Sequence, residues 1–124
     1  MELSFACDNS ADASFLAQEL ELALRRQGLP SESMMLKSSS SENMDIGSVL
    51  WVSMETANQI FGPVSSIASL AACIYEVAKK YNSGVILGED ERRVEIPVTK
   101  INMARIETVL ARYPKPKPKS KSRT

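Results

Sequence analysis

The side chains capable of chemistry are scattered along this chain rather than grouped. Histidine is absent from the 124 residues, which removes the commonest general base and a common metal ligand. Neither a Ser-His-Asp nor a Cys-His catalytic arrangement can therefore be assembled from this chain alone. We predict no catalytic residue, no cofactor-binding residue and no metal ligand, and so a protein that is not an enzyme.

The two cysteines, Cys7 and Cys73, are far apart in sequence and stand in apolar surroundings. This setting predicts two buried thiols in a reduced cytosol, with a disulfide between them as the alternative.

The densest acidic group is Glu89-Asp90-Glu91. Carboxylates are the ligands that Ca²⁺ prefers, but a cluster of this kind is usually a solvated turn, and Arg92-Arg93 beside it can neutralise its charge. We interpret the cluster as the tip of a hairpin rather than as a metal site.

The last residues, 114–124, alternate proline with basic residues and are predicted to be an extended, disordered tail. Removing these 5 basic residues from the 15 in the chain leaves 10 against 15 acidic residues, so the remaining body carries a net charge of −5. The tail is a candidate for weak, salt-sensitive contact with nucleic acid, an anionic membrane surface or a partner, and a solubilising spacer is the alternative. The candidate contact residues are Lys115, Lys117, Lys119, Lys121 and Arg123.

The only tryptophan, Trp51, stands in the apolar run Val49–Val52. Its β-branched neighbours favour a buried strand with Trp51 in the core, although a tryptophan can also stack on a ligand. The methionines Met34 and Met35 similarly suit either a core or an adaptable binding surface.

Residues 1–113 are predicted to form one domain. Alternation over residues 2–7 indicates a strand, and Asn9 or Ser10 can cap a helix that ends near Gln27 and is followed by Gly28 and Pro30. A second strand at 33–37, a polar loop at 38–43 and a third strand at 49–52 come next. A hairpin with strands at 85–87 and 94–98 precedes a last helix that Thr99 can cap.

Between these elements, residues 56–81 read as one long helix, with a seam of apolar positions at spacings of 4 and 3. Because Pro63 suits a first helical turn, a shorter helix from about Gly62 is the alternative. This seam predicts that Ile67 and Ile74 lie at the centre of the core. Ser65 and Ser69 are predicted to lie on the solvent-exposed side of the helix. The seam comprises Ile60, Val64, Ile67, Ala71, Ile74, Ala78 and Tyr81.

The serines, Asn58 and Gln59 in this stretch, and the missing aromatic belt, favour a central core helix over a membrane span. We expect no signal peptide in the first residues, because Glu2 and Asp8 stand where a basic start and an apolar run would be needed. We expect a cytoplasmic protein.

The order of elements predicts an α+β domain. We expect a mixed sheet of four or five strands with three helices packed mainly on one face, partly ferredoxin-like through residue 88, followed by an added strand and helix.

From about Asp45 to Tyr113 the chain resembles the effector-associated constant component domains of bacterial conflict systems. The resemblance rests on the start Ile46-Gly47-Ser48, the Ala/Ser/Ile helix ending in Lys79-Lys80, and the hairpin from Gly84 to Val98. It implies a small non-enzymatic module that works beside a separate effector, such as a protease or a nucleotide-binding ATPase, in bacterial antiviral defence.

Two functions follow as expectations. The first is an interaction module that binds an effector protein as an accessory or adaptor component, needing no cofactor. The alternative is a small-molecule sensor, with a ligand pocket between the sheet and the long helix near Trp51.

Overall fold

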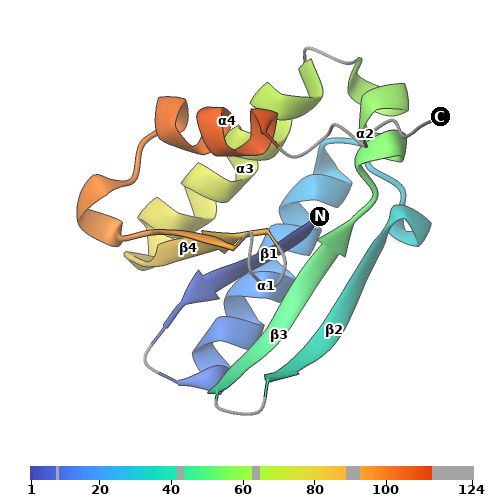
Figure 1. Ribbon diagram of the computed structural model, residues 1–124. Coiled ribbons are helices and arrows are strands. Elements are labelled where there is room, and N and C mark those ends of the chain that lie inside the picture. Colours follow the sequence, from blue (N-terminus) through green and yellow to red (C-terminus); the bar gives the residue numbers. More distant parts are fainter. Residues whose placement is uncertain (8, 42–43, 63–64, 89–92, 113–124) are drawn as a thin grey trace, which may run out of the picture.

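The computed structural model describes residues 1–7, 9–41, 44–62, 65–88 and 93–112. These residues form an α+β domain, as predicted, in which a five-stranded sheet of order β2-β3-β1-β4-β5 is covered by helices on one face (Figure 1). The strands are β1 (Glu2–Ala6), β2 (Met34–Ser41), β3 (Met44–Val52), β4 (Gly84–Leu87) and β5 (Val94–Ile96). The α-helices are α1 (Ser10–Arg26), α2 (Met54–Phe61), α3 (Ser65–Tyr81) and α4 (Met103–Ala111).

The topology interlocks two split β-α-β units. In the first unit α1 connects β1 to β2 while β3 lies between them, and in the second α2 and α3 connect β3 to β4 while β1 lies between them. This is the predicted ferredoxin-like arrangement, and β5 and α4 are the added elements. Every neighbouring pair of strands is antiparallel, so the sheet is not mixed, and the described residues hold four α-helices instead of three.

Helix α1 follows its sequence signals closely. Asn9 caps it, with Oδ1 accepting a hydrogen bond of 2.8 Å from the backbone N–H of Asp12. Glu21 and Arg25, one turn apart, form an ion pair at 3.2 Å. Gly28 has a φ of 107°, so the residue after the helix needs the left-handed conformation that glycine adopts easily. One face of this helix is buried, comprising Ala13, Leu16, Ala17, Leu20, Ala23 and Leu24.

The serine run was predicted to be a loop, and this is wrong. Residues 38–41 continue β2, pairing with β3 from Ser38 opposite Ser48 to Ser41 opposite Met44, with a register shift between Ser39 and Ser40. The reason is that a backbone ladder depends on a partner strand, and β3 begins at Met44, five residues before the predicted Val49. Serine side chains weaken a strand but do not prevent the pairing.

Residues 56–81 do not form one long helix but belong to two helices, which is close to the alternative of a shorter helix from about Gly62. Ser53 caps α2, Gly62 follows it with a φ of 92°, and α3 begins at Ser65. Because the chain bends by 108° between α2 and α3, no single helix in the described parts is long and apolar enough to cross a membrane; only the bent pair meets that length and composition.

The buried side of α3 is also rotated from the predicted seam. Ile74 is buried at 1% exposure, whereas Ile67 is only half-buried and Ile60, on α2, is 49% exposed. Leu70, Cys73 and Val77, which widen the seam on one side, are buried. The residues buried along α3 are Ser66, Leu70, Ala71, Cys73, Ile74, Val77 and Ala78.

The predicted hairpin is confirmed, since β4 pairs with β5 from Val85 opposite Ile96 to Leu87 opposite Val94. Thr99 does not cap the last helix. It lies in a short 3₁₀ turn, Val98–Lys100, and Asn102 caps α4 through a 2.8 Å hydrogen bond from the backbone N–H of Arg105.

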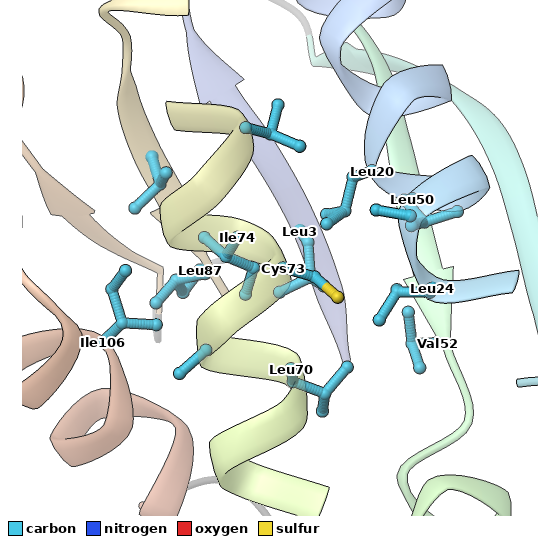
Figure 2. Close-up of a cluster of buried hydrophobic side chains, with 14 of the residues drawn as sticks. Leu3, Leu20, Leu24, Leu50, Val52, Leu70, Cys73, Ile74, Leu87 and Ile106 are labelled. Atoms are coloured by element: carbon cyan, nitrogen blue, oxygen red, sulfur yellow. The ribbon is translucent and has the colours of Figure 1, made fainter. Parts of the chain in front are cut away.

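Side chains from α1, α3 and the helix-facing side of the sheet form one core (Figure 2). Leu3 lies opposite both Leu50 and Leu87, so the three strands at the centre of the sheet contribute one row of leucines to the core beneath α1 and α3. No disulfide joins the two cysteines: Cys73 is buried in this core and Cys7 is half-buried at the end of β1. Burial raises the pKa of Cys73 to about 11, with a smaller contribution from Glu76 and an opposing one from Arg26.

Candidate functional site

A cavity of about 400 Å³ opens where β1 ends, α1 begins and α3 ends. Residues Ala6 and Cys7 contribute the strand side, the first turns of α1 contribute a second wall, and residues 81–83 contribute the third. This volume lies within the range of small-molecule sites in proteins. The two crossovers of the fold bring these three segments together from distant parts of the sequence.

Helix α1 presents one charged and one aromatic side chain to this cavity. Asp12 and Phe15 are three residues apart, and so lie on the same side of the helix. Asp12 is exposed and accepts a hydrogen bond of 3.2 Å from Nδ2 of Asn9. Phe15 is 48% exposed, whereas the neighbouring Leu16 is buried in the core. Phe15 is therefore held at the rim of the cavity rather than in the interior.

The end of α3 faces Phe15 with a second ring. The rings of Phe15 and Tyr81 are perpendicular with centroids 5.5 Å apart, which is a favourable edge-to-face geometry. The Tyr81 hydroxyl lies 3.4 Å from Oε1 of Glu19, to which it donates, and Nζ of Lys80 lies 5.4 Å from the centre of the Tyr81 ring. Tyr81 is thus oriented from two sides.

The turn after α3 is fixed by its backbone. Asn82 has a φ of 54°, in the left-handed region, and the backbone N–H of Ser83 donates to the carbonyl of Ala78 at 2.9 Å. This pairing closes the helix end. Ser83 is buried, and its hydroxyl donates to the carbonyl of Gly84 at 2.8 Å. Cys7 Sγ lies 3.7 Å from the same hydroxyl oxygen.

The thiol of Cys7 lies beside the hydroxyl of Ser83 in this cavity. Within the described ranges, no group of three or more histidine, cysteine, aspartate or glutamate side chains is placed to hold a metal ion.

A second surface is the outer edge of β2. This strand is eight residues long and ends the sheet, so one side of its backbone has no partner strand among the described residues. Met35 is 56% exposed and Leu36 36% exposed, on opposite faces of the strand. The other edge strand, β5, has three residues and is followed directly by Pro97.

A shallower hollow of about 460 Å³ lies beside α4, lined by Val94 of β5, by α4 side chains that include Arg105, and by Arg112 directly after the helix. Asn102, the cap of α4, also borders it.

Trp51 does not lie between the sheet and the long helix. It pairs with Glu2 and Met35, while its neighbour Leu50 pairs with Leu3 in the core beneath the helices. Since alternate side chains point to opposite faces of a sheet, Trp51 lies on the face away from α1 and α3, where it is half-buried.

Other predicted sites lie outside the described residues. These are the acidic cluster Glu89–Glu91 and the tail contacts Lys115, Lys117, Lys119, Lys121 and Arg123.

Sequence analysis missed Phe15 and the edge of β2. A signal for Phe15 was present, because this aromatic residue stands about one helical turn after Asp12.

No protein-family model, curated protein or solved structure matches this chain.

Proposed function

We propose that this protein is a small non-enzymatic interaction module that binds a partner protein by adding a strand of the partner to the edge of β2. The single observation that carries the proposal is the unequal pair of sheet edges, with eight residues at β2 and three at β5. A long strand edge with exposed apolar side chains is a ready template for pairing, whereas a short edge next to a proline is protected.

Strand addition supplies affinity and specificity separately. The unpaired backbone groups of β2 give hydrogen bonds to any extended segment. Specificity comes from the side chains that flank the new strand, here Met35 on one face and Leu36 on the other. Lys37 is held by Glu2 at 3.3 Å, so the described charge nearest this edge is already paired. The partner segment expected is therefore extended and apolar at the positions beside Met35 and Leu36.

The resemblance to effector-associated domains supports an effector protein as the partner. In this proposal the protein is an accessory or adaptor component of a bacterial defence system and acts in the cytoplasm. The basic tail adds weak contact with the partner, nucleic acid or an anionic membrane surface.

The test uses the product of an effector gene encoded beside this protein's own gene. Binding is measured by calorimetry for the wild type, for the double variant Met35→Lys with Leu36→Lys, and for Val98→Lys. Val98 is a matched control, because it is 38% exposed and follows β5 at the opposite edge. We expect the double variant to weaken binding by at least about tenfold, since loss of central interface contacts has effects of that order, and the control to leave it unchanged.

Equal binding by the wild type and the double variant would rule out strand addition at β2. Turnover of simple hydrolase or transferase substrates by the purified protein would rule out a non-enzymatic module.

A second candidate function is small-molecule sensing. The cavity between the end of β1, α1 and the end of α3 favours it, because aromatic and polar groups converge there from segments far apart in sequence. The ligand would contact Phe15 and Tyr81 rather than Trp51.

A further inference from the structure

We infer that the cavity beside Phe15 binds a small organic cation with an apolar body, of the arylalkylamine type. The inference rests on the second candidate function, small-molecule sensing, and is independent of strand addition at β2.

The first argument is charge. Among the described residues that line the cavity, Asp12 carries the one charged side chain, and its carboxylate is exposed to the opening. The first turn of α1 and the carboxyl end of α3 both border the cavity, so their opposite helix dipoles offset each other. The carboxylate of Asp12 therefore favours a positive ligand over a negative one.

The second argument is the aromatic wall. Phe15 exposes about half of its surface at the rim, although the core lies directly beneath Leu16. Aromatic ring faces attract ammonium groups. The adjacent Tyr81 already has the ammonium of Lys80 5.4 Å from its ring centre, so one ring of the pair accepts a cation within the protein itself.

The third argument is size and shape. About 400 Å³ is room for one aromatic ring with a short aliphatic chain, and the exposed Phe15 surface gains from being covered by an apolar body. The polar groups deeper in the cavity do not require a ligand partner, because Ser83 donates to Gly84 and its oxygen is within 3.7 Å of Cys7 Sγ. Charge recognition is therefore concentrated at Asp12.

The experiment compares three probes of matched size: phenethylamine, phenethyl alcohol and phenylacetate. Each is titrated into the full chain, and NMR shifts of backbone amides are followed. We expect saturable shifts with phenethylamine at Ala6, Asp12, Phe15 and Asn82. We also expect the alcohol to bind about two- to fivefold more weakly, as the loss of one exposed charge interaction implies, and the carboxylate more weakly still.

Two variants test the assigned contacts. Asp12→Asn keeps an acceptor oxygen for Asn9 but removes the charge, and Phe15→Leu keeps an apolar group but removes the ring. Each is expected to weaken phenethylamine binding by about two- to fivefold. The matched controls are Glu55→Gln, an exposed carboxylate on α2, and Leu22→Ala, a 44% exposed residue of α1 away from the cavity. Both should leave the affinity unchanged.

The outcomes distinguish a wrong ligand class from a wrong assignment of small-molecule sensing. Binding of the alcohol or the carboxylate as tightly as the amine, or an affinity for the amine that Asp12→Asn leaves unchanged, would overturn the cationic ligand class while keeping the cavity as a binding site. The absence of saturable shifts with all three probes would overturn both the ligand class and small-molecule sensing at this cavity.

Discussion

Ser66 donates its hydroxyl hydrogen to Oδ1 of Asn58 at 2.5 Å, across the break between α2 and α3. Ser66 has no exposed surface, and Asn58 is half-buried. The bond joins two helices that the chain connects through a bend of 108°. A buried polar pair of this kind defines how α2 sits against α3 more strictly than apolar packing would.

Replacing Ser66 by alanine should therefore be costly. We expect Ser66→Ala to lower the free energy of unfolding by about 1–3 kcal/mol, because the Asn58 oxygen loses its donor in a partly desolvated position. Ser65→Ala, one residue earlier and exposed, should cost less than about 0.5 kcal/mol. Urea denaturation of both variants measures the difference. Equal costs would show that the hydroxyl bond contributes nothing to stability.

The rotation of α3 gives a second prediction. Ile74→Ala should cost about 2–5 kcal/mol, as truncations in a packed core do. Ile67 is half-buried at the margin of the core, so Ile67→Ala should cost clearly less, although the sequence pattern treats the two positions as equivalent. Urea melts of the two variants decide the matter, and a cost at Ile67 as large as that at Ile74 would contradict the observed orientation of α3.

These two positions show what periodicity can and cannot provide. The spacing of apolar residues predicted that α3 is helical and mostly buried, but it did not separate Ile67 from Ile74, because the width of the buried side depends on what packs around it. Here α1 packs on one side of α3 and α4 on the other. Burial consequently extends to Leu70, Cys73 and Val77.

The pairing of β2 with β3 could not be predicted from local sequence signals. Turn chemistry and capping residues are local signals, and they placed α1 and the β4–β5 hairpin correctly. The serine run of β2 has no local strand signal, and only pairing with β3 makes it a strand. The candidate cavity could not be predicted from the sequence either, because the two crossovers of the fold, and no local motif, bring Phe15 and Tyr81 together.

The buried thiol of Cys73 predicts a pH dependence. Its pKa rises from 9.0 to about 11 in the folded state, chiefly through burial. The folded state therefore holds a proton that the unfolded state has lost between these values. The contribution to stability is complete below about pH 9 and is lost as the pH rises toward the folded pKa.

At about pH 10 this loss amounts to about 1 kcal/mol relative to about pH 8. Urea melts at both pH values should therefore show a larger decrease for the wild type than for Cys73→Ala, which lacks the group. Parallel decreases in the two proteins would mean that Cys73 ionises equally in both states.

In thiol-labelling experiments at neutral pH, the half-buried Cys7 should react before Cys73.

The basic tail can be tested separately from the fold. Truncation after Tyr113 removes five basic residues and changes the net charge from 0 to −5. We expect the melting temperature to remain almost unchanged, because proline and lysine alternation offers no apolar surface to bury. Any binding to nucleic acid or anionic lipid should disappear with the tail and weaken steeply with added salt in the full chain. A truncated protein that fails to fold would refute the division into a domain and a tail.

The unequal sheet edges also limit how this protein can assemble. Within the described part of the chain, one sheet edge is long enough to accept a strand, so the valence of that part for edge pairing is one. If a second copy occupied β2 in place of a partner, both long edges would be consumed, and only the three-residue β5 strands would remain at the ends. Growth would stop at two molecules, because continued addition needs two open edges on every unit. A sheet with one usable edge can therefore recruit a strand without becoming the seed of a fibre.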